Sequence, residues 1–346
     1  MPPVPTPRGE VSEAVLDALG RPVHALVAPP VRSSGDALAD EDLQLALYVM
    51  YELHYRGLDG ADEGWEWEPS LLALRRSLEE AFTQSLFALA GAPEREDVTP
   101  EEMDIALRAI AESDDGPSLS RHLERRGTLE QILEFVVHRS AYQLKEADPH
   151  AWAIPRLSGQ AKAALVEIEV DEFGGGRAER IHAALFAQAM EELGLDATYG
   201  AYVDRIPALT LATVNLMSLL GLHRRWRGAI VGHLALFEMT SSLPNRRYGN
   251  ALRRHGFGER ATAFFDEHVE ADAVHEAIAS VDLAGGLVRA EPALAGDLLW
   301  GARTLAAIES RWSASLLAAW GEGRTSLLSP LGNPAAPQDA IAAKRL

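Results

Sequence analysis

Residues 264–280 read FFDEHVEADAVHEAIAS and place His268, Asp272 and His275 at intervals of four and three residues. On an α-helix, at about 100° per residue, these three side chains fall within an arc of roughly 60° and point at one spot. Two imidazoles and a carboxylate suit iron, zinc or manganese better than calcium or magnesium. The alternative for this triplet is an exposed acidic helix face, so the rest of the chain must decide.

Composition limits the class of protein. The 346 residues are 47% apolar, which is enough for a large core. We find no apolar run of about 20 residues and no signal-peptide pattern, so we expect a cytoplasmic protein with no membrane partner. The chain has no cysteine, which leaves His, Asp and Glu to hold any metal, and its net charge of −19 argues against a nucleic-acid partner.

The order of patterns along the chain predicts an all-α fold. We expect a loosely packed N-terminal arm at 1–38 with one helix at 10–19, N-terminal helices at 39–127, a core at 128–322 and a C-terminal tail at 323–346. Apolar residues at helical spacing predict further helices, and Thr99 and Thr128 are their clearest N-caps. A turn is expected at Pro244. No strand alternation is evident. The predicted helices span 40–56, 69–89, 101–112, 128–145, 160–193 with an interruption, two helices within 207–242, one ending at 255, the helix bearing His268, and 297–320.

The interrupted stretch at 160–193 holds a second set of candidate ligands. Glu172, Glu179 and His182 are separated by seven and three residues, which on a continuous helix places them within about 80° of one another. The three glycines at 174–176 oppose a continuous helix, because each costs up to about 1 kcal/mol relative to Ala. They indicate a helix break, a close approach of another helix, room for a ligand or a hinge. The alternative is a plain loop with Glu172 facing solvent.

Two further acidic positions lie within predicted helices. Glu238 is surrounded by apolar residues in a predicted helix, where an unpaired carboxylate is costly, so it needs a partner such as a cation. Glu134 and His138 lie four residues apart, and we interpret them as an ordinary helical pair because no partner ligand is evident on that face.

The candidates together favour two metal ions over one. Glu172, Glu179, His182, Glu238, His268, Asp272 and His275 supply three imidazoles and four carboxylates, a charge of about −4, which two divalent ions neutralise. Helix bundles carry two irons in cages of this kind, although the ferritin-like version uses a pair of ExxH motifs. Here only Glu179 and His182 have that spacing.

The order ExxxxxxExxH, a single Glu on a later helix and HxxxDxxH resembles the heme-oxygenase-like diiron oxidase and oxygenase family, also called iron-containing redox enzymes. The resemblance covers roughly residues 128–320. It implies a heme-oxygenase-like helical bundle with additional N-terminal helices, two iron ions and O2 as cosubstrate. The ligands it implies are Glu179, His182, Glu238, His268, Asp272 and His275. Glu172 matches an extra, mobile carboxylate of the N-oxygenating members, and Glu146 matches an acidic position found in some of them.

The resemblance also implies the activity. We expect a diiron oxidoreductase that oxidises a small amine- or amino-acid-derived substrate in natural-product biosynthesis, including N-oxygenation, and takes electrons from an external reductant because the chain has no cysteine for an iron–sulfur centre. The oligomeric state stays open, with a homodimer among the alternatives. Two other classes remain: a cofactor-free or heme-binding protein on the same bundle, and a metal-binding scaffold whose acids are mostly exposed.

Overall fold

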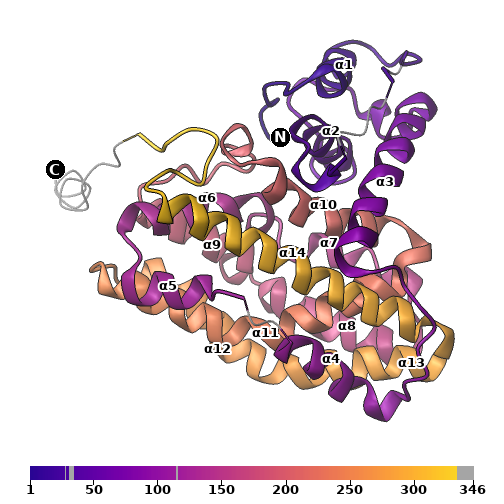
Figure 1. The fold of residues 1–346 in the computed structure, drawn as a ribbon, viewed down its shortest axis with the longest axis vertical. Coiled ribbons are helices and arrows are strands. Elements are labelled where there is room, and N and C mark those ends of the chain that lie inside the picture. Colours follow the sequence, from indigo (N-terminus) through magenta and orange to yellow (C-terminus); the bar gives the residue numbers. More distant parts are fainter. Residues whose placement is uncertain (28, 31–34, 114–115, 333–346) are drawn as a thin grey trace.

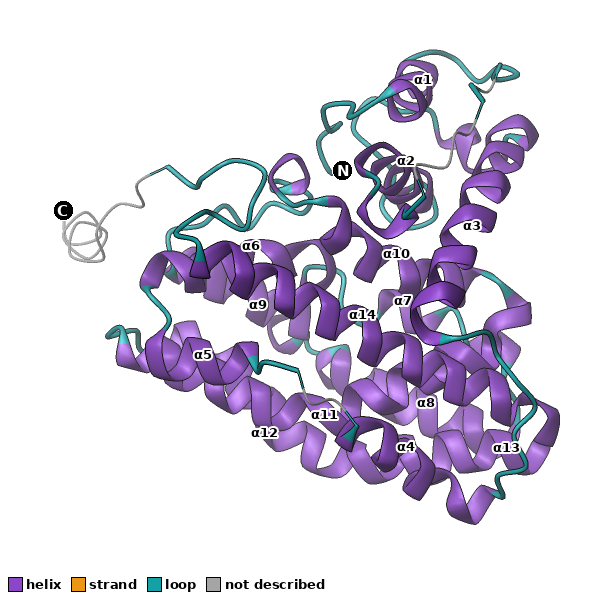
Figure 2. Ribbon diagram, in the orientation of Figure 1, coloured by secondary structure: helices purple, strands orange, loops and turns teal. Residues whose placement is uncertain are grey.

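Helices form all the regular structure that the computed structural model describes, which comprises residues 1–27, 29–30, 35–113 and 116–332 (Figure 2). The predicted all-α class is therefore confirmed. The α-helices are α1 (Glu10–Leu19), α2 (Glu41–Glu52), α3 (Pro69–Ala90), α4 (Met103–Glu112), α5 (Leu119–Arg126), α6 (Leu129–Gln143), α7 (Asp148–Ala151), α8 (Gly159–Glu172), α9 (His182–Glu192), α10 (Ala208–Leu222), α11 (Arg227–Arg254), α12 (Glu259–Ala277), α13 (Gly286–Ala290) and α14 (Ala295–Gly321).

The long helix α11 lies at the centre of the bundle, between α12 and α14 (Figure 1). Glycines let α11 and α14 approach closely. A Cβ atom on Gly232 would lie 1.8 Å from the carbonyl oxygen of Leu298, and one on Gly301 would lie 2.0 Å from that of Ala229. No side chain fits in so small a space, so these two glycines set the distance between the central helices.

The predicted helix starts at Thr99 and Thr128 are present. Thr128 Oγ1 accepts a hydrogen bond from the backbone of Gln131, whose side chain accepts one from the backbone of Thr128. Thr99 makes the corresponding exchange with Glu102 at the start of a 3-10 turn that leads into α4. Each exchange satisfies backbone N–H groups that a helix end leaves unpaired, which is why this local pattern is readable from sequence.

The turn predicted at Pro244 is wrong, because α11 continues through it to Arg254. A proline inside a helix removes one backbone hydrogen bond and costs about 3 kcal/mol. α11 packs on α12, α14 and α5 over its length, and this burial outweighs the local penalty.

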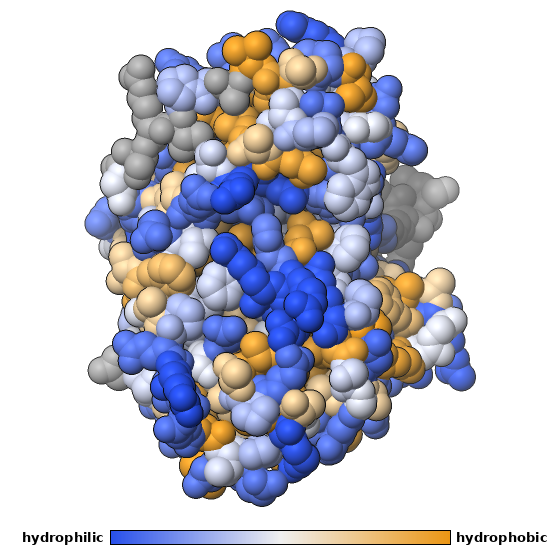
Figure 3. All heavy atoms as spheres, turned by 90° about the vertical axis from the view of Figure 1, so that its right-hand side faces the viewer, coloured by the Kyte–Doolittle hydropathy of each residue, from blue (hydrophilic) through white to orange (hydrophobic). Residues whose placement is uncertain are grey.

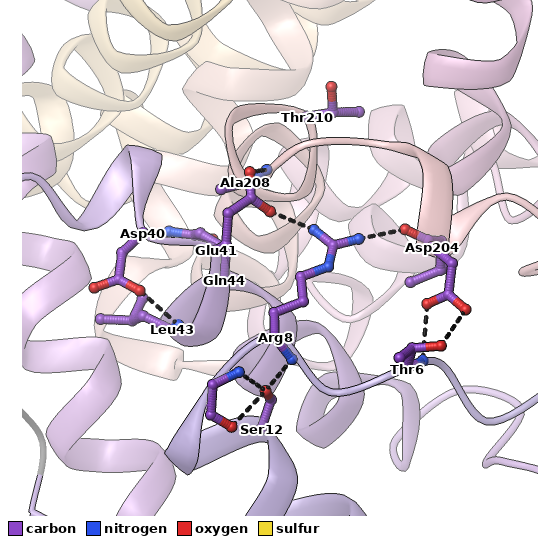
Figure 4. A network of polar contacts seen from close by, with 12 residues as sticks. Thr6, Arg8, Ser12, Asp40, Glu41, Leu43, Gln44, Asp204, Ala208 and Thr210 are labelled. Atoms are coloured by element: carbon purple, nitrogen blue, oxygen red, sulfur yellow. Dashed lines mark hydrogen bonds and ion pairs between the residues drawn. The ribbon is translucent and has the colours of Figure 1, made fainter. Parts of the chain in front are cut away.

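Residues 6–19 of the N-terminal arm are packed against the rest of the protein, whereas a loosely packed arm was predicted. Val15 and Leu19 of α1 are buried against α2. Arg8 donates to Glu41 of α2 and to the carbonyl of Val203, both at 2.5 Å, while Thr6 donates to Asp204 (Figure 4). The arm is thereby fastened both to α2 and to the turn before α10.

A buried ion pair joins α2 to the core. Lys145, which is 1% exposed, follows α6 and donates to Glu52. The hydroxyl of Tyr199 donates to the other oxygen of Glu52 at 2.6 Å. The pair fixes the backbone immediately before Glu146.

Glu134 and His138 hold the start of the C-terminal tail, as an ordinary structural pair would. Glu134 accepts hydrogen bonds from Trp320 Nε1 and from the backbone N–H and hydroxyl of Ser326, and His138 Nε2 lies 3.0 Å from the same hydroxyl. Leu327 is buried. The remainder of the predicted tail, 333–346, lies outside the described residues.

The surface mixes residue types. On the face in Figure 3, hydrophobic residues occur in small groups among hydrophilic ones. Within the described part of the chain, no helix has both the length and the apolar character needed to cross a membrane.

Candidate metal centre

Four side chains from separate parts of the chain meet in the interior of the bundle. They are Glu146, Glu172, His182 and His268, all buried, and each offers a ligand atom within 4.8 Å of the others. His182 Nδ1 lies 2.8 Å from Glu172 Oε2, and His268 Nε2 lies 3.5 Å from Glu146 Oε1. The two imidazole rings are 4.4 Å apart between centroids.

A second group shares one member with the first. Glu172, Glu238 and His275 also offer ligand atoms within 4.8 Å of one another, and all three are buried. His275 Nδ1 lies 3.3 Å from Glu238 Oε2. Glu172 belongs to both groups, so the two lie side by side with a carboxylate between them.

α12 supplies two of the histidines, His268 and His275. His268 and His275 are 4% and 0% exposed, respectively, so the exposed-face alternative fails for both. The Nδ1 of His268 contacts the carbonyl oxygen of Phe264 at 2.8 Å, one helical turn earlier. A hydrogen bond donated there leaves the Nε2 lone pair directed at Glu146. The side chain of Asp272 lies outside the described residues.

Glycines bring Glu172 and His182 together. Gly174, Gly175 and Gly176 have φ angles of 68°, 60° and 79°, in the left-handed region that residues with a Cβ avoid. A Cβ on Gly174 would also lie 2.6 Å from backbone atoms of residues 180 and 181. The chain therefore turns back on itself directly after α8, and His182 begins α9 beside the end of α8.

The helical-face prediction for Glu179 is wrong for the same reason. Glu172 is the last residue of α8, and Glu179 lies in a separate 3-10 turn, Ala178–Arg180, where it is exposed. Spacing of seven and three residues aligns side chains only on a continuous helix. Glu179 belongs to neither buried group, whereas Glu172, expected to face solvent if the glycines form a loop, is buried.

Burial and charge shift the pKa values of the carboxyls. Burial is the largest influence on Glu146 and Glu238 and raises the pKa of both. Burial acts in the same direction on Glu172, but the adjacent His182 outweighs it and the pKa of Glu172 is lowered. The same contact raises the pKa of His182 against the effect of its burial.

Several of these atoms lack a partner of suitable geometry. Glu146 Oε2, Glu172 Oε2 and His182 Nδ1 are buried and make no hydrogen bond of good geometry, although the last two form an ion pair with each other at 2.8 Å. Buried polar groups without partners are costly, and a cation would satisfy several converging lone pairs at once. Imidazole and carboxylate donors suit a transition metal such as iron. The residues present therefore fit a metal site, and their burial disfavours a scaffold with mostly exposed acids.

Two residues beside the groups were not predicted. The Oδ2 of Asp171 lies 3.1 Å from His275 Nε2. Glu169 is 3% exposed, and burial, followed by the charges of Glu172 and Glu238, raises its pKa to about 9. The spacing of three between Glu169 and Glu172 was a usable helical signal. Nothing in the sequence marked Asp171, since its partner comes from α12.

Two hollows reach the centre from different sides. A cavity of about 700 Å³ ends at Glu146 and His268, and its wall includes the aromatic rings of Phe135, Phe237 and Tyr248. A second hollow, of about 410 Å³, reaches His182 beside the glycine turn that follows α8. Its wall is largely polar, and its residues are Asp171, Gly174, Gly175, Arg177, Arg180, His182, Glu267, Glu270 and Ala271.

The fold and the site define the chain as an all-α bundle with buried imidazoles and carboxylates that could hold a metal. The sequence profile of the family described as iron-containing redox enzyme matches residues 133–310, just over half of the chain, and this range includes both groups. The chain belongs to this heme-oxygenase-like family, as the resemblance predicted. No curated protein matches the chain.

Proposed function

We propose that this protein is a non-heme diiron oxidase or oxygenase that uses O2 to oxidise a small organic substrate. The observation that carries the proposal is the sharing of Glu172 by two adjacent buried groups. One carboxylate between two sets of nitrogen and oxygen donors is an arrangement suited to two metal ions rather than one. Membership of an iron-containing redox family supports iron as the metal.

Each part of the centre has a role in the proposal. Glu146, His182 and His268 would hold one iron, Glu238 and His275 would hold the other, and Glu172, which belongs to both groups, could serve either. Asp272, predicted as a ligand from its place on α12, remains part of the proposed set. Glu179 is left out because it is exposed.

Two ferrous ions at this centre would supply the electrons and open coordination positions for the reduction of O2. The protein supplies the buried side chains that surround the centre. In the metal-free protein, burial raises the pKa of Glu169 to about 9, so Glu169 keeps its proton at neutral pH next to Glu172 and Glu238. Electrons for further turnovers come from an external reductant.

The large cavity supports a small organic substrate. Its volume of about 700 Å³ falls in the range of small-molecule sites, and it ends at two proposed ligands. Aromatic rings line part of its wall, while Arg139, Gln143 and Arg247 add polar groups. A molecule with an apolar body and polar ends fits this lining. We therefore propose an amine- or amino-acid-derived substrate, and we propose N-oxygenation as the reaction.

Anaerobic titration with Fe(II) tests the function. We expect about two ferrous ions per chain, and a transient visible absorption band when the loaded protein is mixed with O2. His182→Ala and His268→Ala should each lower iron binding, because each removes a buried imidazole from the centre. His24→Ala, on the exposed N-terminal arm, is the matched control and should bind iron as the parent protein does.

Two results together would contradict the proposed diiron function. If the protein binds no iron, and both substitutions in the centre leave stability unchanged, the diiron proposal is wrong. The non-catalytic helical scaffold would then be the better description.

A further inference from the structure

His275 is held between two carboxylates from two different helices. Its Nδ1 lies 3.3 Å from Glu238 of α11, and its Nε2 lies 3.1 Å from Asp171 of α8. The ring itself is fully buried. A carboxylate contact at each ring nitrogen therefore fixes the orientation of the imidazole. A histidine that only filled space in the core would not require two such contacts.

The two carboxylates have opposite surroundings. Glu238 is 5% exposed and belongs to the buried group with Glu172. The side chain of Asp171 is 60% exposed and lines the polar hollow. Nδ1 thus faces the metal centre, whereas Nε2 faces a carboxylate at the protein surface.

A neutral imidazole can bind a metal through only one nitrogen while the other carries a proton. The group that accepts this second N–H decides which nitrogen keeps its lone pair and how the ring is turned. The Asp171 carboxylate is placed to be this acceptor, because its Oδ2 lies 3.1 Å from Nε2 of His275.

We propose that Asp171 is a positioning residue of the diiron centre, which accepts the Nε2 hydrogen of His275 and so directs the Nδ1 lone pair at the metal shared with Glu238 and Glu172. This inference rests on the proposed function. Asp171 acts only through His275 and touches neither the metal nor the substrate.

The end of α8 carries both the proposed metal-binding carboxylate, Glu172, and the carboxylate that positions His275, Asp171. Asp171 and Glu172 are consecutive, so their side chains leave the helix about 100° apart. Glu172 points into the centre and Asp171 points to the hollow beside the glycine turn. A single helix end thereby places the shared carboxylate and the residue that orients a ligand of the second metal.

Substitutions at Asp171 test the inference through metal affinity. Asp171→Asn removes the charge and can present an amide N–H to His275, which favours the wrong tautomer. Loss of such an outer partner weakens metal binding by about 10–100-fold. We expect one of the two metal equivalents to weaken by this factor, and Asp171→Glu to recover part of it.

The measurement is an anaerobic titration of the full chain with Fe(II), and with Co(II) followed by visible absorption, against a competing chelator. Glu270→Gln is the matched control, because it removes one negative charge from the wall of the same hollow. It should leave both affinities unchanged. The metal-free Asp171→Asn variant should remain folded with a melting temperature close to that of the parent, because the Asp171 side chain is mostly exposed and its contact with His275 contributes little to stability.

The results of these titrations distinguish the positioning role of Asp171 from the proposed diiron function. Unchanged affinities in Asp171→Asn, or an equal loss in the Glu270→Gln control, would overturn the positioning role while two-iron binding by the parent stands. A parent protein that binds two ferrous ions without reacting with O2 would overturn the proposed function, and the affinity comparison would still decide the role of Asp171. A parent that binds fewer than two ions would overturn both.

Discussion

Gly174→Ala should disrupt the metal centre, whereas Gly175→Ala, one residue further on, should be far milder. Both glycines have positive φ, so alanine at either position pays a backbone penalty of about 1–2 kcal/mol. At Gly175 nothing lies within 4 Å of the added Cβ. At Gly174 the Cβ would lie 2.6 Å from the backbone at 180–181, which cannot yield without moving His182.

The clash gives the magnitude of the difference. Overpacking of a close contact costs about 1–3 kcal/mol, so Gly174→Ala should lose about 2–5 kcal/mol in total. The displaced backbone carries His182 away from Glu172, which it now approaches to 2.8 Å. We therefore expect Gly174→Ala to lose iron at the site that contains His182, and Gly175→Ala to keep both irons.

The assay compares the two variants directly. Denaturant unfolding of the metal-free proteins gives the difference in stability, and anaerobic Fe(II) titration gives the number and affinity of bound ions. If the two variants are equally stable and bind iron equally, the close turn is not what positions His182, and the reasoning from backbone geometry is refuted.

Three other perturbations have defined outcomes. Lys145→Met leaves Glu52 charged and buried, so the free energy of unfolding should fall by about 3–5 kcal/mol in denaturant titration; a change below about 1 kcal/mol would contradict the buried ion pair. Gly232→Ala forces a Cβ to within 1.8 Å of the Leu298 carbonyl, and a lower melting temperature is expected; an unchanged one would mean that the central helices can separate freely. The pKa of His275 is raised to about 9, because its two carboxylate partners outweigh the effect of burial. A raised histidine pKa stabilises the fold fully below the ordinary value of 6.5 and loses this effect as the pH rises through about 9, so metal-free protein should become less stable between these pH values, and a flat or rising melting temperature there would count against it.

Local signals in the sequence identified most of the long helices, whereas the short helices α5, α7 and α13 were not predicted. The exchanges at Thr99 and Thr128 and the apolar spacing define elements because they act within one or two turns of chain. The turn predicted at Pro244 was wrong because the sequence shows only the local cost of a proline in a helix, a few kcal/mol. It does not show the burial of α11 among its neighbours, which outweighs that cost.

By itself the sequence determined an all-α fold, the family, and the histidines of α12, because residues four and seven apart on one helix share a face wherever that helix lies. Only the tertiary structure decided which acids join them. The spacing of Glu179 and His182 suggested a pair, but three glycines with positive φ end the helix and put Glu172 beside His182 instead. Asp171 contacts His275 across 104 residues of chain. Such contacts depend on how helices pack and where the chain reverses, and no periodicity within a single segment carries that information.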